Sequence, residues 1–291
     1  MFSVQSKIAI CGLLVSLLAC KKDITSTTNK SYTSHDGLKI SYTDSGHGDT
    51  TLFFIHGWCI NKEYWQNQID YFKNRYRCIA VDLPGFGASD KSRKDWSFDH
   101  YTSDVIKCID SLKLKNVILI GHSMSGDIIL MAASRHTPNV IGIIGIDNLH
   151  SPGQPYDSAQ SVANTLFFDN FRANYDTVAI NTMGSFLFQP STPDSVKTRV
   201  LKNVLEADHD ISISVLEALA QIAQTEMTMM SQLQMPLVLV NSDVQPVQLD
   251  TLNKYCLKGA KVFYVHGTGH YPMIESADEF NRKLEEAIKS K

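Results

Sequence analysis

A serine and a histidine, far apart in the chain, stand in sequence contexts that suit a nucleophile and its base. Ser123 lies within Gly121-His122-Ser123-Met124-Ser125-Gly126, directly after the apolar stretch 117–120. Small residues two positions before and after a serine permit the sharp strand-to-helix turn that exposes its hydroxyl, and here Ser125 stands where glycine is more usual. A serine hydroxyl attacks a carbonyl only when a neutral imidazole takes its proton. His270, which follows a glycine-rich loop near the C-terminal end, is the histidine that we expect to do so.

The elements that must position these residues alternate along the chain. Short alternating or wholly apolar stretches predict strands at 38–42, 51–55, 78–81, 117–120, 140–146, 237–240 and 261–265. Helical patterns lie at 61–74, 98–112 and 127–136. This alternation predicts an α/β fold, with a mostly parallel central sheet and helices on both faces. The segment 151–234 breaks the rhythm because it is helical in pattern, and we expect it to cover the edge where open α/β sheets bind ligands.

Four motifs follow one another in an order that one superfamily shares. They are His56-Gly57-Trp58, Asp82-Leu83-Pro84-Gly85-Phe86-Gly87-Ala88-Ser89, the serine motif and Gly267-Thr268-Gly269-His270. With them the chain resembles the α/β-hydrolase superfamily over roughly residues 35 to 290, apart from the inserted segment. The resemblance implies the α/β-hydrolase fold, with a core at 32–150 and 235–291 and a helical lid insertion at 151–234. It also implies an oxyanion hole made by the backbone N–H groups of Trp58 and Met124.

The acid that should complete a triad has two candidates, and both keep the order Ser, Asp, His. Asp147 ends the strand predicted at 140–146, where some families of this fold, including haloalkane dehalogenases, place their acid. Asp243 follows the strand predicted at 237–240, but members of the superfamily typically carry the aspartate two residues further on, where this chain has Gln245. We therefore expect Asp147 to be the acid and keep Asp243 as the alternative.

The resemblance implies a cofactor-free serine hydrolase that acts on a small or medium carboxylic ester or lactone through an acyl-enzyme on Ser123. Serine at this position argues against dehalogenases and epoxide hydrolases, which use aspartate there. Two other classes remain open: a carbon–carbon bond hydrolase or perhydrolase with the same triad, and a ligand-binding sensor with a vestigial triad. The histidines and cysteines lack the spacing of a zinc site, and there is no glycine-rich phosphate loop, so we expect neither a metal nor a cofactor.

The N-terminal residues have the features of an export signal. Lys7 precedes an apolar stretch at 8–19, which is too short to span a membrane comfortably, and Leu17-Leu18-Ala19-Cys20 resembles the lipidation site of bacterial lipoproteins. We expect a signal peptide at 1–19 and a lipidated tether at 20–31, with Cys20 carrying the lipid. The protein would then be lipid-anchored in the cell envelope, and this anchor would be its only contact with the membrane.

Other partners are constrained by charge and cysteine content. The net charge is −3 and no basic stripe is present, which argues against a nucleic-acid partner and leaves a small-molecule ester as the expected one. Cys59, Cys78, Cys108 and Cys256 could pair in an oxidising compartment, although Cys78 and Cys108 lie in apolar surroundings that suit buried free thiols. The sequence leaves both the pairing and the oligomeric state open.

Overall fold

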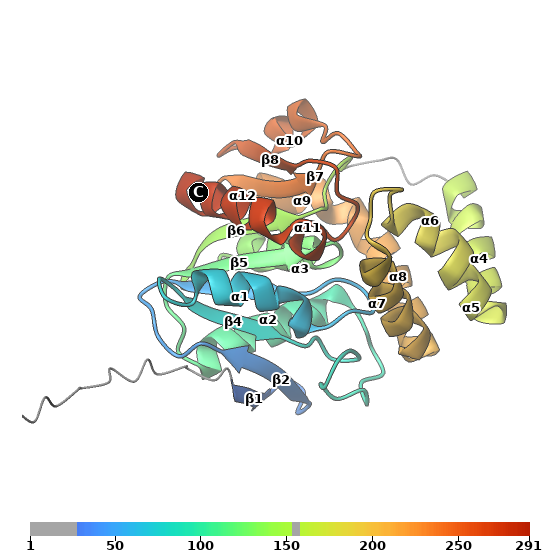
Figure 1. The fold of residues 1–291 in the computed structure, drawn as a ribbon, viewed down its shortest axis with the longest axis horizontal. Coiled ribbons are helices and arrows are strands. Elements are labelled where there is room, and N and C mark those ends of the chain that lie inside the picture. The colour runs from blue at the N-terminus through green and yellow to red at the C-terminus, as the bar shows by residue number, and fades with distance from the viewer. Residues whose placement is uncertain (1–27, 153–157) are drawn as a thin grey trace, which may run out of the picture.

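A sheet of eight strands runs through the molecule in the order β1-β2-β4-β3-β5-β6-β7-β8 (Figure 1). The computed structural model describes residues 28–152 and 158–291, so the expected signal peptide and Cys20 lie outside the described residues. β2 pairs antiparallel with both of its neighbours, and all the other pairs are parallel. The strands are β1 (Thr28–Thr33), β2 (Lys39–Asp44), β3 (Thr51–Ile55), β4 (Arg77–Val81), β5 (Val117–His122), β6 (Val140–Ile146), β7 (Leu237–Ser242) and β8 (Ala260–Val265).

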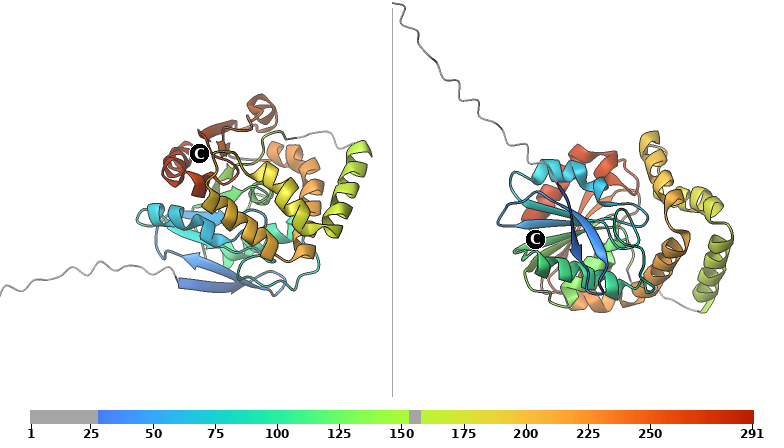
Figure 2. Two further views of the ribbon diagram at one scale, coloured as in Figure 1. Left: turned by 45° about the vertical axis from the view of Figure 1, so that its right-hand side comes forward. Right: turned by 90° about the horizontal axis from the view of Figure 1, so that it is seen from below.

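Helices cover both faces of this sheet, as Figures 1 and 2 show. One face carries α1 (Gln66–Phe72), α11 (Pro272–Glu275) and α12 (Ala277–Ser290). The other carries α2 (Phe98–Ser111), α3 (Ser125–Ser134) and α9 (Glu226–Ser231), with α10 (Leu249–Tyr255) beside α9. The strands in the middle are covered on both faces, since every residue of β3 and β5 is buried. This is the predicted α/β fold.

The segment between β6 and β7 is mostly helical in its described residues, with loops between the helices. We call its first five helices, together with the π-helical turn η2, the insertion helices. They are α4 (Ser158–Ala173), α5 (Tyr175–Thr177), η2 (Val178–Met183), α6 (Gly184–Leu187), α7 (Asp194–Glu206) and α8 (His209–Ile222). Figure 2 shows them gathered on one side of the sheet. No helix within residues 28–152 and 158–291 combines the length and the apolar character needed to cross a membrane.

The N-terminal edge of the sheet differs from the expectation. The tether was expected to run through residue 31, but β1 begins at Thr28 and pairs along its length with β2, from Thr28 opposite Asp44 to Thr33 opposite Lys39. An edge strand is held through its backbone hydrogen bonds, so its side chains need not alternate between apolar and polar. The polar segment 28–31 therefore belongs to the sheet.

All four cysteines in the described core are buried free thiols: Cys59, Cys78, Cys108 and Cys256. Burial raises the pKa of Cys59 and of Cys78 to about 12, and that of Cys256 to about 11. Thiols that stay protonated at neutral pH are poor nucleophiles, so we do not expect these cysteines to act as nucleophiles.

Candidate active site

Ser123 occupies the sharp turn between β5 and α3. Its backbone has φ +54°, a left-handed conformation that costs a non-glycine residue about 1–3 kcal/mol and is found at functional sites. Its N–H donates to the carbonyl of Ile146 at the end of β6 (2.9 Å), which fixes the turn against the neighbouring strand. Gly121 is required by the tightness of the turn, since a Cβ there would lie 2.3 Å from the backbone oxygen of Ser125.

Two buried side chains brace this turn. The Ser125 hydroxyl donates to the carbonyl of His56 at 2.5 Å, so the serine that replaces the usual glycine joins the turn to the loop after β3. The Asn148 amide donates to the carbonyls of Gly121 (3.0 Å) and Ser123 (3.3 Å) from the end of β6. Asn148 packs against Gly126, where a Cβ would lie 2.1 Å from its amide nitrogen. The nucleophile turn is thus held by both neighbouring strands.

We expect Asn148→Ala to destabilise the protein by about 1–3 kcal/mol, because the carbonyls of Gly121 and Ser123 would each lose a hydrogen bond and the space beside Gly126 would be left unfilled. Denaturant unfolding would measure the loss. Asn67→Ala, at an exposed position of α1, is the control and should change stability by less than about 0.5 kcal/mol. Equal effects of the two substitutions would show that Asn148 does not brace the turn.

The loop after β3 brings a second backbone donor beside the serine. His56 is buried and accepts the N–H of Leu83 on its Nε2 (2.9 Å), while its Nδ1 donates to the carbonyl of Gly57 (2.7 Å). A Cβ on Gly57 would lie 3.1 Å from the Cβ of Ser123, so the loop approaches the turn closely. The next N–H is that of Trp58. Within the described residues neither this N–H nor that of Met124 donates to another group, so both remain available to a ligand.

Asp147 and His270 are joined by a short hydrogen bond. The His270 Nδ1 lies 2.6 Å from one carboxylate oxygen of Asp147, and the other oxygen accepts the N–H of Ser242 at 2.9 Å. Burial alone would raise the pKa of Asp147, but the hydrogen bond and the charge of His270 outweigh it and hold that pKa well below its usual range. The carboxylate is therefore ionised at neutral pH, as an acid that orients an imidazole must be.

Asp243, the alternative acid, does not reach His270. Its carboxylate bonds the Nδ1 of His266 (2.9 Å) and the N–H of Gly267 (3.0 Å) in an exposed turn after β7 and β8. The hydrogen bond from His266 lowers the pKa of Asp243. The carboxylate of Asp243 is therefore ionised and stabilises the turn through these two hydrogen bonds. The structure thus brings Asp147, and not Asp243, to the histidine.

The loop that carries His270 is fixed on several sides. The His122 Nε2 lies 2.7 Å from the carbonyl of His270, so the ring donates there, and burial lowers the pKa of His122 to about 3. The Glu275 carboxylate accepts the N–H groups of Gly269 (2.8 Å) and Tyr271 (3.0 Å) on either side of the histidine. His122 therefore remains neutral and supports the loop.

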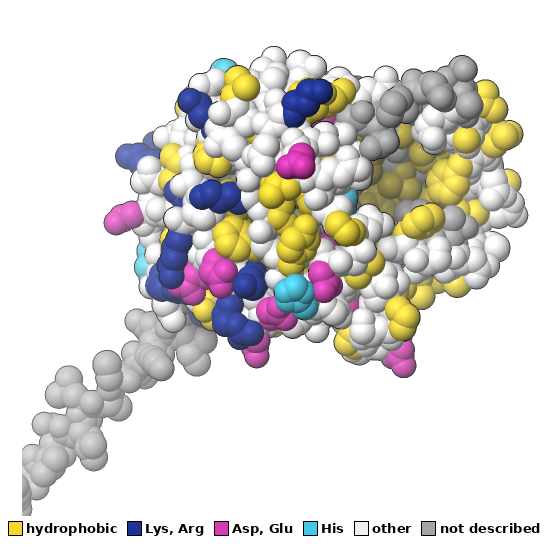
Figure 3. Space-filling view, turned by 90° about the horizontal axis from the view of Figure 1, so that it is seen from above, with side chains coloured by type: hydrophobic (Ala, Val, Ile, Leu, Met, Phe, Trp, Pro, Cys, Tyr) yellow, Lys and Arg dark blue, Asp and Glu magenta, His cyan; other side chains and the backbone are white. Residues whose placement is uncertain are grey.

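Ser123 and the His270–Asp147 pair line one cavity of about 340 Å³. The core contributes Ser123, His270, Asp147 and the Trp58 side chain, whose indole donates to the carbonyl of Ser212 in α8 (2.8 Å). The insertion helices contribute apolar side chains at Phe186, Leu187, Leu216 and Leu219. Figure 3 shows a hollow with hydrophobic side chains on the side of the molecule where these helices lie. The volume falls at the lower end of the range typical of small-molecule sites.

Sequence reasoning missed one histidine of this cavity. His150 follows Asp147 by three residues, and its Nε2 lies 3.7 Å from the nearer oxygen of Asp147. Its Nδ1 lies 2.9 Å from the backbone carbonyl of Gln245, to which it donates. The position of His150 just beyond the carboxyl end of β6 was the available signal, because ligands bind at that edge of such sheets.

Comparison with known proteins gives a family for this arrangement. The sequence model described as "alpha/beta hydrolase fold" matches residues 50–268. The chain is 30% identical over 164 residues to a non-heme chloroperoxidase of Streptomyces lividans, covering 55% of this chain and 58% of that protein. It is 33% identical over 109 residues to a bifunctional esterase/perhydrolase of Acinetobacter calcoaceticus, covering 37% and 39%. The chain thus spans between about two fifths and three fifths of the length of these curated relatives.

Solved structures share the fold over nearly the whole chain. An esterase from Exiguobacterium antarcticum superimposes with a TM-score of 0.78 at 20% identity, covering 90% of this chain and 100% of that one. A bromoperoxidase from Bacillus anthracis does so with a TM-score of 0.76 at 19% identity, with the same coverage. At these identities the likeness concerns the fold and does not extend to activity.

Proposed function

Because the chain belongs to the alpha/beta hydrolase family, we propose that it is a cofactor-free serine hydrolase acting on a small or medium carboxylic ester or lactone. One observation carries the proposal. Ser123, on its strained turn, lines the same cavity as the His270–Asp147 pair and Trp58, and the backbone N–H groups of Trp58 and of Met124, next to Ser123, have no acceptor within the described part of the chain. Nucleophile, base, acid and oxyanion donors are the groups that acyl transfer requires.

Each group has a defined role in the proposed reaction. His270 takes the proton of Ser123 as the serine oxygen bonds to the ester carbonyl carbon, and the two N–H groups bind the resulting oxyanion. Asp147 stabilises the imidazolium that forms. His270 then gives its proton to the departing alcohol as the carbon–oxygen bond breaks, leaving an acyl group on Ser123. Water repeats the sequence, with His270 as its base, and releases the carboxylic acid.

The cavity favours an uncharged substrate. Asp147 is the only acidic residue among its described lining residues, and none of them is a lysine or arginine. A carboxylate on the substrate would therefore lose its hydration without gaining a fixed cation, which is costly. The apolar side chains of α6 and α8 instead suit an aliphatic or aromatic acyl or alkyl group. These features favour neutral esters and lactones over anionic ones.

The test is covalent labelling followed by a substrate panel. A fluorophosphonate should label Ser123 stoichiometrically, and peptide mapping would locate the adduct. p-Nitrophenyl esters of rising acyl length should then be turned over, with monoesters of dicarboxylic acids as the matched anionic substrates and much poorer ones. A chain that binds these esters but neither labels nor turns them over would be a ligand-binding sensor, and the proposal would fail.

Substitution of a cavity residue tests whether this space holds the acyl chain. Leu219→Trp should lower kcat/KM for the longest acyl ester by at least about tenfold while sparing the acetate, because filling an apolar pocket removes room worth about 1–3 kcal/mol. Leu166→Trp, at a position of α4 that is 64% exposed, is the matched control and should leave the chain-length profile unchanged. An unchanged profile in Leu219→Trp would place the acyl group elsewhere.

A second candidate activity rests on the relatives. Several proteins that match parts of this chain are named as chloroperoxidases, a haloperoxidase or a bifunctional esterase/perhydrolase. In a perhydrolase, hydrogen peroxide would replace water in the second step and release a peracid from the same acyl group on Ser123. Halide-dependent bromination of monochlorodimedone in acetate and peroxide measures it. Loss of both activities in Ser123→Ala is expected if they share the acyl-enzyme.

A further inference from the structure

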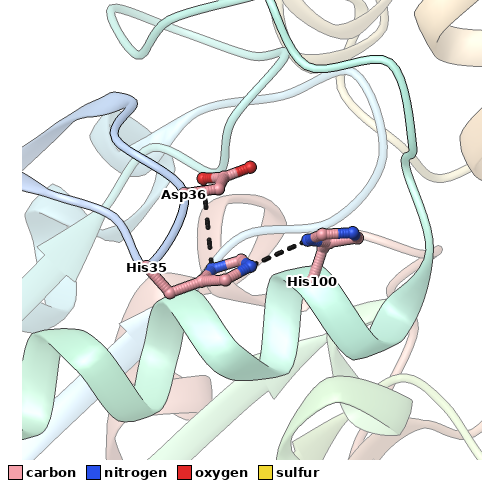
Figure 4. Close-up of side chains that lie close together, drawn as sticks. All are labelled: His35, Asp36 and His100. Atoms are coloured by element: carbon pink, nitrogen blue, oxygen red, sulfur yellow. Dashed lines mark hydrogen bonds and ion pairs between the residues drawn. The ribbon is translucent and has the colours of Figure 1, made fainter.

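A second group of histidines lies outside the cavity. His35, in the turn between β1 and β2, faces His100, in the first turn of α2, and the His35 Nε2 lies 2.8 Å from the His100 Nδ1 (Figure 4). Neither residue lines the cavity that contains Ser123. Their side chains are 29% and 32% exposed, so solvent reaches the pair.

A carboxylate lies beside the outer nitrogen of each ring. The His35 Nδ1 lies 2.8 Å from Asp104, and the His100 Nε2 lies 3.2 Å from Asp95. An ionised carboxylate only accepts hydrogen bonds, so the His35 Nδ1 carries the ring hydrogen and the His35 Nε2 keeps its lone pair. The two inner nitrogens face each other at 2.8 Å, close enough for one metal ion to bind both.

The carboxylates beside His35 and His100 resemble those found around metal-binding histidines. A histidine that binds a metal almost always donates its other ring N–H to a carboxylate, which fixes the ring and raises its basicity. The His35 ring has this arrangement through Asp104, and Asp95 forms an ion pair with the outer nitrogen of His100. Asp104 is 1% exposed and is itself held by Arg93 through two bonds of 2.8 and 3.0 Å, so the orientation of His35 is fixed from inside the protein.

A third oxygen ligand is close to the two rings. One ligand atom from each of Asp36, His35 and His100 lies within 4.8 Å of the others (Figure 4). Asp36 also accepts bonds from Arg93 and Ser34. The positive charge of Arg93 so close to the ligands weakens the site, and we expect binding in the micromolar range.

We propose that His35, His100 and Asp36 bind a divalent transition-metal ion such as Zn²⁺, with water completing the coordination. Imidazole nitrogens select zinc, nickel or copper, whereas magnesium and calcium prefer sites built wholly from oxygen. The ion would join the β1–β2 turn to α2. This would stabilise the folded state, because a ligand that binds only the folded chain raises its stability by mass action.

Calorimetric titration of Zn²⁺ into the full chain, prepared without a polyhistidine tag, tests the proposal. We expect one zinc ion per chain whose affinity falls at least tenfold in His35→Gln and in His100→Gln. Asp95→Asn removes only the carboxylate behind His100, from a position 66% exposed, and should cost about 10- to 100-fold. Mg²⁺ should not bind at this site.

Two exposed histidines outside the cluster serve as controls. His47→Gln and His266→Gln remove other surface imidazoles and should leave the zinc affinity unchanged. The thermal midpoint without zinc shows that every variant is folded, and with saturating zinc it should rise by several degrees in the wild type and in these two controls only. Equal zinc affinity in the wild type, His35→Gln, His100→Gln and Asp95→Asn would overturn the proposal and leave only a hydrogen bond between the two rings.

Discussion

Ser123→Ala should lower kcat for ester hydrolysis by about 10³- to 10⁶-fold, because the residues of a triad act as a unit and the attacking oxygen would be gone. The substitution removes only the hydroxyl from a turn whose backbone is held by Ile146, Asn148 and Ser125. Thermal and denaturant stability should therefore remain within about 0.5 kcal/mol of the wild type. Steady-state kinetics on a p-nitrophenyl ester and circular dichroism would measure the two effects.

The control is Ser92→Ala, in an exposed loop, which should retain full activity and full fluorophosphonate labelling. Ser123→Ala should lose the label entirely. If the folded variant kept more than a few per cent of wild-type turnover, the acyl-enzyme mechanism would be wrong, even if the protein proved to be an ester hydrolase of another kind.

Replacing the acid of the triad is expected to give the second large loss of activity. We expect Asp147→Asn to lower kcat by up to about 10⁴-fold, by analogy with the serine-protease triad, because a neutral amide cannot stabilise the imidazolium and favours the wrong tautomer of His270. The 2.6 Å contact between the Asp147 carboxylate and the His270 Nδ1 is the basis of this expectation. KM should change much less than kcat, because the carboxylate lies behind the imidazole and acts on the transition state.

Asp243→Asn is the matched variant, since it makes the same chemical change in the other candidate. Its carboxylate contacts only His266 and Gly267, so near-normal kcat is expected, with at most a local loss of stability in the turn. The reverse result, in which Asp243→Asn loses activity and Asp147→Asn keeps it, would assign the acid to Asp243 and require the loop after β7 to move toward His270.

The order of core elements was predictable because the central strands are buried on both faces. A strand in that position must be apolar at every residue, so stretches such as 117–120 and 140–146 are visible in the sequence, and the structure places β5 and β6 there. The edge strand β1 was not predicted, since its pairing with β2 depends on backbone hydrogen bonds that leave no pattern in its polar side chains.

The sequence by itself determined the motifs around Ser123 and His270, because a sharp turn and a glycine-rich loop are local requirements on neighbouring residues. Only the tertiary structure decided which carboxylate meets His270. Asp147 and Asp243 both follow parallel strands, and the choice depends on where β6 and β7 end relative to the loop after β8. The pairing of His35 with His100 was equally hidden, because these rings come from a turn and a helix 65 residues apart and meet only when α2 packs beside the β1–β2 turn. Contacts between distant residues depend on packing, and spacing along the chain does not encode them.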